Sequence, residues 1–193
     1  MLEERRSSRR FGERPLSAAQ LGEFLFRTSR IRRTGSFEGE TYAYRPYPCG
    51  GASYELEVYA AVRACEDLEP GLYYYDGCGH SLRAVGDYSP AVERLVEHAW
   101  NATGRLGVPH VLLILAARFG RVAWKYESIA YSLILKDVGV VMQTMHLAAA
   151  AMGLAACAVG CGDSDLFSMA AGTDYYTESS VGEFVLGSAA EPA

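Results

Sequence analysis

Residues 124–162 of the chain read WKYESIAYSLILKDVGVVMQTMHLAAAAMGLAACAVGCG, and this stretch decides the fold. Apolar residues recur in it at three- and four-residue spacing and no proline interrupts them, which predicts a helix that runs to about Met152. The second half is apolar on almost every side, so we expect a central helix that is buried on most faces. Gly153 predicts the end of the helix, because glycine readily adopts the left-handed conformation of a helix C-cap.

A short strand and a glycine turn follow this helix. The segment LAACAVG at 154–160 has the apolar character of a buried strand, and Gly160-Cys161-Gly162 predicts a tight turn. A buried helix that leads into a strand ending in glycines can bring bare backbone close to a flat ligand. The turn lacks the third glycine of a dinucleotide-binding fingerprint, which argues against a Rossmann domain.

Length and composition favour one globular domain over residues 1–193. Half of the residues are apolar and 21% are charged, which is typical of a chain with a full core and not of a disordered one. The apolar runs are interrupted before membrane-spanning length and the N-terminus lacks a signal-peptide core, so we expect a cytoplasmic chain with no membrane partner. The five cysteines form neither a CxxC pair nor a zinc spacing, so we expect reduced thiols and no metal site.

The net charge of −5 is unevenly spread. Nine of the eighteen lysine and arginine residues lie in residues 1–33, beside four acidic residues. This basic arm is short and lacks interleaved aromatic residues, so we expect no nucleic-acid partner and a compact anion such as phosphate instead. Within it, ERRSSRRF at 4–11 alternates the arginine forks and serine hydroxyls that suit a phosphate. A solvated basic terminus is the commoner meaning of such a run.

The rest of the chain predicts helices, strands and hairpins in alternation. Ser17 and Gln20 form a capping box for a helix to about Arg30, and residues 31–44 are expected to be a loop. Strands are expected at 55–65, 72–76, 80–87, 109–119 and 181–187, and helices at 90–101 and 165–172. The strand at 109–119 is apolar almost throughout, so we expect it in the middle of the sheet. The predicted class is α+β around a mixed sheet.

Two glycines follow a proline-containing approach in RPYPCGGA at residues 45–52. The prolines fix the direction of the backbone, while Gly50 and Gly51 permit positive φ and a close approach to a ligand. The same residues could form an ordinary connection into the next strand.

Four segments together resemble a known family. They are RRSSRRF at 5–11, RPYPCGGASYELEVY at 45–59 with PGLYYYD at 70–76, KYESIAY at 125–131, and AAMGLAACAVG at 150–160. The first resembles the opening of the FMN-dependent nitroreductase superfamily. The others resemble its SagB/ThcOx-type dehydrogenase branch, the azoline oxidases of peptide biosynthesis. The segments occur in the family's order and the resemblance extends from Arg5 to Gly187.

The resemblance implies a homodimer of nitroreductase-like α+β domains, each with a mixed sheet flanked by helices around a long central helix, and FMN bound between the subunits. By their motif positions, Arg5, Ser7 and Arg9 would hold the FMN phosphate, with Arg6 nearby. The residues implied to line the flavin are Pro48, Cys49, Gly50, Gly51, Gln143, Val159, Gly160 and Cys161. Arginine and serine suit a phosphate, and backbone donors suit a reduced flavin ring.

The branch is associated with a Lys-Tyr pair, and here the pair is Lys125 and Tyr126. Azoline oxidation transfers a ring proton to a base and a hydride to the flavin. A partly desolvated lysine has a lowered pKa and can be that base, with the tyrosine as a positioned hydrogen-bond partner. The residues alone also allow a snorkelling lysine beside a core tyrosine.

Two departures from the branch bear on function. Cys49 stands where the branch has serine, and VVMQTM at 140–145 keeps Gln143 but lacks the neighbouring histidine and asparagine. The expected function is oxidation of thiazoline or oxazoline rings in a peptide-derived product, with a cyclodehydratase or synthetase as a candidate partner. The rivals are an NAD(P)H-dependent nitro or quinone reductase, and a flavin-free scaffold member of a synthetase complex.

Overall fold

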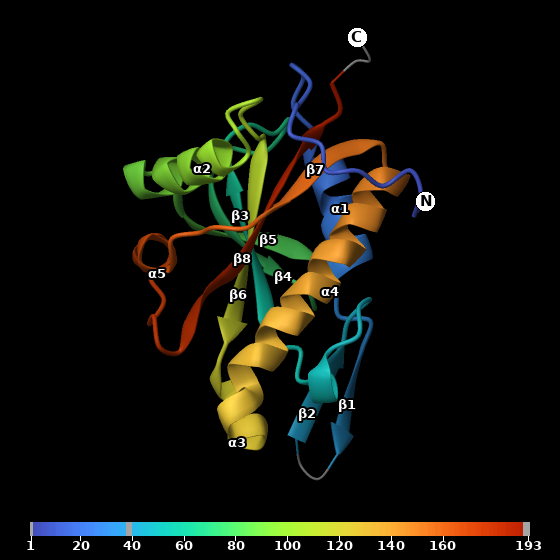
Figure 1. The fold of residues 1–193 in the computed structure, drawn as a ribbon, viewed down its shortest axis with the longest axis vertical. Coiled ribbons are helices and arrows are strands. Elements are labelled where there is room, and N and C mark those ends of the chain that lie inside the picture. Colours follow the sequence, from blue (N-terminus) through green and yellow to red (C-terminus); the bar gives the residue numbers. More distant parts are fainter. Residues whose placement is uncertain (1, 38–39, 191–193) are drawn as a thin grey trace.

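The chain folds around a six-stranded sheet, seen in the computed structural model of Figure 1. The structure describes residues 2–37 and 40–190. The strand order is β5-β4-β3-β6-β8-β7. The bounds are β3 (Leu56–Val62), β4 (Gly71–Asp76), β5 (Ser81–Asp87), β6 (Val111–Arg118), β7 (Leu154–Val159) and β8 (Glu178–Ser188). Every neighbouring pair is antiparallel, so the predicted α+β class is confirmed while the sheet itself is antiparallel where a mixed one was expected.

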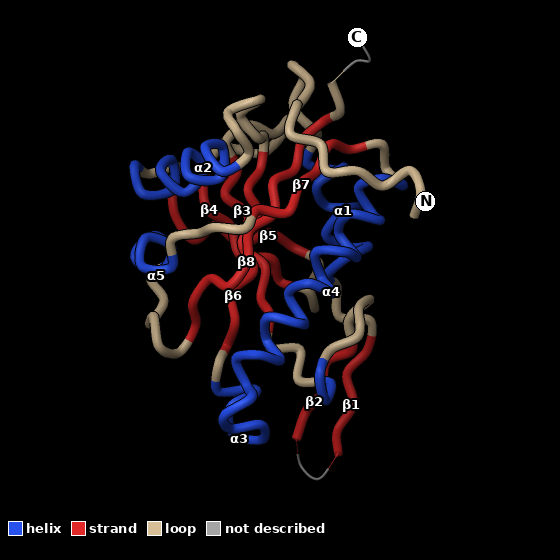
Figure 2. The backbone as a smooth tube through the Cα atoms, in the orientation of Figure 1, coloured by secondary structure: helices blue, strands red, loops and turns tan. Residues whose placement is uncertain are grey.

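Helices cover both faces of this sheet (Figure 2). One face carries α1 (Ala18–Ser29) and α4 (Ala130–Ala151), and the other carries α2 (Pro90–Ala102) and α5 (Ser164–Ala171). Along β6, Leu113 and Leu115 pack into the core beneath α1 and α4, whereas Leu112 and Ile114 pack into the core beneath α2 and α5. Because both of its faces are buried, β6 lies inside the sheet, as its continuous apolar sequence predicted.

The predicted helix ends are confirmed by their caps. The Gln20 N–H donates to the Ser17 hydroxyl over 3.2 Å, and the Ser17 N–H donates to the Gln20 side chain over 2.9 Å. Gly153 adopts φ 65° directly after α4, the left-handed conformation that stops the helix. At α5, the Asp163 carboxylate caps the first turn by accepting from the Leu166 N–H over 2.9 Å.

The predicted loop at residues 31–44 is wrong, because most of it forms a hairpin. The strands β1 (Arg33–Phe37) and β2 (Glu40–Tyr44) pair antiparallel and project beside the start of α4 in Figure 1. Aromatic residues favour strands, and the Arg33 guanidinium lies 4.3 Å from the centroid of the Tyr44 ring across the ladder. Residues 38–39, which also fell in the predicted loop, lie outside the described residues.

The central helix differs from its prediction at its start. A first helix, α3 (Gly120–Tyr126), and a 3₁₀ turn, η2 (Glu127–Ile129), precede α4, and Glu127 at φ 43° breaks the helix between them. The second half of α4 is covered on most sides, as its apolar composition predicted, because between Val141 and Ala150 only Gln143 is exposed. The exposed apolar residues Tyr131 and Leu135 lie in the first half of α4.

Residues 120–151 have the length and mean hydropathy of a membrane-crossing helix. A core helix of a soluble protein meets the same criterion, and here the stretch is broken at Glu127 and lays its apolar face on the sheet.

Strand β8 begins at Glu178, three residues before the predicted start. The Glu178 carboxylate accepts from Arg118 on β6 over 2.9 Å, so this polar pair extends the ladder beyond the apolar residues that were used to predict it.

Candidate functional site

The arginine-rich segment lies along the edge of the sheet. The Ser8 N–H donates to the Ala156 carbonyl of β7 over 2.8 Å, and Phe11 forms an antiparallel bridge with Ala189. These bonds hold the segment against the edge of the sheet, close to the C-terminal end of α4.

A cavity of about 740 Å³ opens between this segment, α4 and the start of β7. Arg6, Ser7 and Arg9 line it together with the buried His146 of α4. Burial lowers the pKa of His146, and the positive charge of Arg5 lowers it further. The lining holds three arginines, Arg6, Arg9 and Arg10, beside one carboxylate, Glu4, and this excess of cations suits a ligand with a compact negative charge.

The predicted glycine turn forms η1 (Gly50–Ala52), a 3₁₀ turn that packs against α4. The Gly50 N–H donates to both carboxylate oxygens of Asp137 over 3.1 Å. Gly51 adopts φ 58°, as predicted, whereas Gly50 does not adopt positive φ. A Cβ on Gly51 would collide with the Tyr126 hydroxyl, so only glycine fits at this position.

Lys125 and Tyr126 end α3 beside this turn. The Lys125 ammonium lies 5.5 Å from the centroid of the Tyr126 ring. A cavity of about 300 Å³ is lined by Lys125 and Gly51 among others. The structure thus brings the predicted catalytic pair and the predicted glycine turn together. Lys125 is exposed, so the desolvation expected for it would have to come from a ligand or a second chain.

The remaining predicted residues lie elsewhere. Val159 is buried at the end of β7, opposite Glu183 of β8, and Cys161 is exposed in a depression beside α2. Pro48 and Gln143 are exposed. Within one described chain, the predicted flavin residues therefore line separate depressions.

The spacing along α4 shows how far the glycine turn lies from the arginine cavity. Asp137 contacts the glycine turn, and His146 faces the arginine cavity nine residues later, which corresponds to about 14 Å of helix.

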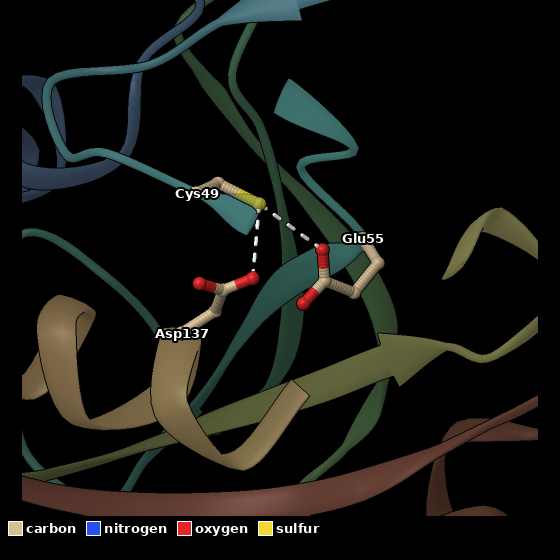
Figure 3. Close-up of side chains that lie close together, drawn as sticks. All are labelled: Cys49, Glu55 and Asp137. Atoms are coloured by element: carbon tan, nitrogen blue, oxygen red, sulfur yellow. Dashed lines mark hydrogen bonds between the residues drawn. The ribbon is translucent and has the colours of Figure 1, made fainter. Parts of the chain in front are cut away.

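Sequence reasoning missed a side-chain cluster beneath the glycine turn (Figure 3). The Cys49 sulfur lies 3.3 Å from a Glu55 carboxyl oxygen and 3.2 Å from an Asp137 carboxyl oxygen, so its single S–H can donate to either of them, and the sulfur accepts from the Tyr54 N–H over 3.1 Å. Burial raises the pKa of the Cys49 thiol and of the Glu55 carboxyl. An acidic residue in an apolar helix and another at the start of an apolar strand were the available signals.

A buried ionic network holds the approach to this turn. The Arg45 guanidinium donates to Glu57 over 3.2 Å and to the Ser29 carbonyl over 2.7 Å. Glu57 also pairs with Arg118 over 3.2 Å, and Arg118 pairs with Glu178. The alternation of Glu57 with apolar neighbours in β3 was the sequence signal for a buried charge.

Comparison with known proteins identifies the family. The Nitroreductase family matches residues 2–187. This chain belongs to the nitroreductase family. The family makes the chain an oxidoreductase, in agreement with the predicted enzyme class.

Two relatives and two solved structures place it within the family. The chain is 27% identical over 160 residues to a protein of Methanocaldococcus jannaschii named as a nitroreductase, covering 83% of this chain and 76% of that one. It is 30% identical over 116 residues to the microcin B17-processing protein McbC of Escherichia coli, covering 57% of this chain and 42% of McbC.

Among solved structures, the E. coli microcin synthetase McbBCD complex with truncated pro-MccB17 bound matches with a TM-score of 0.80 at 23% identity, covering 97% of this chain and 70% of that one. A nitroreductase-family structure from Anabaena variabilis matches with a TM-score of 0.74 at 27% identity, covering 87% of this chain and 34% of that one. The nitroreductase fold expected from the sequence is therefore confirmed.

The contact between Gly51 and Tyr126 gives a stability prediction. Gly51→Ala should lower the free energy of unfolding by roughly 1–2 kcal/mol, because of its positive φ, and by more where the new Cβ displaces the Tyr126 hydroxyl. Tyr126→Phe in the same chain should recover part of the loss, measured by urea unfolding. Gly50→Ala is the control, because its Cβ would meet Asp137 at an ordinary 3.4 Å. A double variant as unstable as Gly51→Ala alone would contradict the contact.

Glu183 gives a prediction for pH. Burial raises its pKa from 4.5 to about 7, so the folded chain holds this proton more tightly than the unfolded chain does. Protonated Glu183 contributes to the free energy of unfolding at low pH. This contribution, up to about 3 kcal/mol, should be lost as the pH rises through 7. Glu183→Gln should flatten this part of the profile in urea unfolding at pH 5 and pH 8. The exposed Glu69→Gln should keep the wild-type slope, and an unchanged slope in Glu183→Gln would contradict the assignment.

Proposed function

We propose that this chain is an FMN-dependent oxidoreductase of the SagB/ThcOx type. In this proposal it oxidises thiazoline or oxazoline rings of a peptide-derived product to thiazole or oxazole in the cytoplasm. The observation that carries the proposal is the arginine and serine cavity at the end of α4, in a chain of the nitroreductase family.

The residues of this cavity fit the phosphate of FMN. A phosphate carries negative charge on several oxygens and accepts from guanidinium forks and hydroxyls, and Arg6, Ser7 and Arg9 supply both kinds of donor within one cavity. At the glycine turn, the missing Cβ of Gly51 makes room for the Tyr126 hydroxyl, and Gly51 lines a second cavity together with Lys125. When bound, FMN supplies a hydride acceptor.

The chain's own residues would handle the proton. Oxidation of an azoline ring removes one proton and one hydride, and the two electrons finally pass to dioxygen, which leaves as hydrogen peroxide. Lys125 in its neutral form would accept the ring proton at its Nζ, and the Tyr126 hydroxyl above Gly51 would orient the ring. A substrate that covers the exposed Lys125 would also remove water from it and so favour the neutral amine.

A homodimer would complete this site. The outer face of α3, η2 and α4 exposes Trp124, Ile129, Tyr131 and Leu135, an apolar surface that a second copy could cover. A second copy could also set its own glycine turn beside the first copy's arginine cavity, which would join depressions that one chain keeps apart.

The similarity to McbC supports the substrate class, because that relative is named for microcin B17 processing. The McbBCD complex is a synthetase with its precursor bound. By analogy, we propose that this chain acts on a peptide and works beside a cyclodehydratase or synthetase partner. The chain spans less than half of McbC, so the analogy covers only the part that they share.

Two alternatives have observations of their own. The M. jannaschii relative is named as a nitroreductase and matches most of this chain, which favours an NAD(P)H-dependent nitro or quinone reductase. The replacements at Cys49 and Thr144 favour a flavin-free scaffold member. Turnover of NAD(P)H with a nitroaromatic and none with an azoline peptide would establish the reductase. Purified protein that stays colourless with added FMN would establish the scaffold.

Phosphate binding can be tested through its arginines. Arg5→Ala combined with Arg9→Ala should weaken FMN affinity at least about tenfold, because charge-assisted hydrogen bonds to the phosphate are lost. Flavin fluorescence on titration measures the affinity. Arg94→Ala, which removes an exposed arginine from α2 in the opposite helical layer, should leave it unchanged. Equal affinity in the double variant and the wild type would remove the assignment.

The catalytic base can be tested separately from flavin binding. Lys125→Ala should slow oxidation of an azoline peptide by about 100-fold, because a general base contributes on this scale, while FMN stays bound. Mass spectrometry follows the loss of two hydrogens from the ring. The matched control is Lys136→Ala, which removes the chain's other lysine from the exposed side of α4. Full activity in Lys125→Ala would end its role as the base.

A further inference from the structure

Three side chains that could bind a metal converge beneath the glycine turn, as Figure 3 shows. They are the thiol of Cys49, just before η1, the carboxylate of Glu55, just before β3, and the carboxylate of Asp137 in α4. Their ligand atoms lie within 4.8 Å of one another. Glu55 is 0% exposed and Asp137 is 7% exposed, so both carboxylates are withdrawn from water.

The cluster has acidic groups without a described counter-charge. No ion pair of Cys49, Glu55 or Asp137 with a lysine or arginine occurs among residues 2–37 and 40–190. The Oε1 atom of the fully buried Glu55 also has no hydrogen-bond partner in that part of the chain. A buried carboxylate oxygen normally has a partner, so an unpaired one beside two other ligand atoms points to a missing cation.

We propose that Cys49, Glu55 and Asp137 bind one divalent transition-metal ion, and that Zn²⁺ fits the site best. Tetrahedral zinc with typical bond lengths sets a sulfur and an oxygen ligand about 3.5 Å apart. The sulfur of Cys49 lies 3.3 Å from Glu55 and 3.2 Å from Asp137, so both sulfur–oxygen distances are close to that value. A thiolate disfavours the hard ions Mg²⁺ and Ca²⁺, and zinc accepts both sulfur and carboxylate oxygen.

The backbone around the cluster supports the ligands. The Gly50 N–H donates to the Asp137 carboxylate, and the Tyr54 N–H donates to the Cys49 sulfur. Such outer hydrogen bonds orient metal ligands and stabilise their anionic forms. Binding forms bonds from the metal to the sulfur and the two carboxylates, releases the thiol proton to solvent, and changes no oxidation state. Three protein ligands leave a fourth position for water.

The metal would join the segment from Cys49 to Glu55 to α4, which is distant from it in sequence. Cys49 and Asp137 are 88 residues apart, which is why the cysteine spacing predicted no metal site. The ion would fix the glycine turn to α4 and to the start of β3. This inference does not rest on flavin binding or on the proposed reaction.

The full chain, treated with a chelator and dialysed, provides the test. Titration with Zn²⁺ against a chromophoric chelator should show one ion bound per chain. Titration with Co²⁺ should produce a thiolate-to-cobalt charge-transfer absorption, read as a difference spectrum against the metal-free protein. Absence of zinc binding, or cobalt binding without the thiolate band, overturns the proposal.

Variants locate the ion. Cys49→Ser and Glu55→Gln should each weaken zinc binding at least about tenfold, and Cys49→Ser should abolish the cobalt band. The matched control, Cys78→Ser, removes an exposed thiol from the β4–β5 turn and should bind as the wild type does. Circular dichroism of the metal-free variants checks their folding, and if Cys49→Ser does not fold, Glu55→Gln and the wild-type cobalt spectrum decide. Wild-type affinity in Glu55→Gln places the ion elsewhere and overturns the proposal.

Discussion

The buried pairing of Arg45 with Glu57 is the constraint on which the candidate site depends. Both side chains are only 4% exposed, and charges removed from water are tolerated only when paired and hydrogen-bonded. The Arg45 guanidinium must therefore reach both Glu57 on β3 and the Ser29 carbonyl at the end of α1. Few backbone paths satisfy both bonds, so the segment that follows Arg45 enters η1 from a fixed direction.

The geometry of the candidate site also depends on α4, which contributes apolar residues to the core and positions polar residues at the site. Its buried side carries Met145 and Ile134 into the sheet core and also carries Asp137 and His146. Asp137 binds the glycine turn, and His146 faces the arginine cavity. A rigid helix thus sets the distance between two candidate binding regions, and movement of one relative to the other would require movement of the core.

Much of the fold could be predicted from the sequence because its signals are local. The capping box at Ser17 and the left-handed Gly153 depend on neighbouring residues, and so did their predictions. The hairpin at 33–44 was missed because glycines suggested a loop, whereas cross-strand pairing decided the structure. The break of the central helix at Glu127 was missed because glutamate is an ordinary helix residue, and nothing in the sequence indicated a positive φ there.

In the candidate site too, local features could be predicted from the sequence and contacts between distant residues could not. The positive φ of Gly51 was predicted from residue type alone, and the basic character of the first residues was read from composition. The cluster of Cys49 with Asp137 could not be predicted from the sequence, because 88 residues separate the two and only the packing of η1 on α4 joins them. Sequence motifs therefore indicated where the backbone makes a tight glycine turn, but not which buried acids lie behind that turn.

The arginine-rich segment also has a consequence for self-association. Strand β7 is the last strand of the sheet, and such an edge offers unpaired backbone groups to strands of other molecules. The Ser8 N–H occupies the Ala156 carbonyl, and the Gly12 N–H occupies the Ser188 carbonyl of β8. The segment therefore occupies part of the β7 edge, and its arginines place like charges in the path of a second copy of that edge.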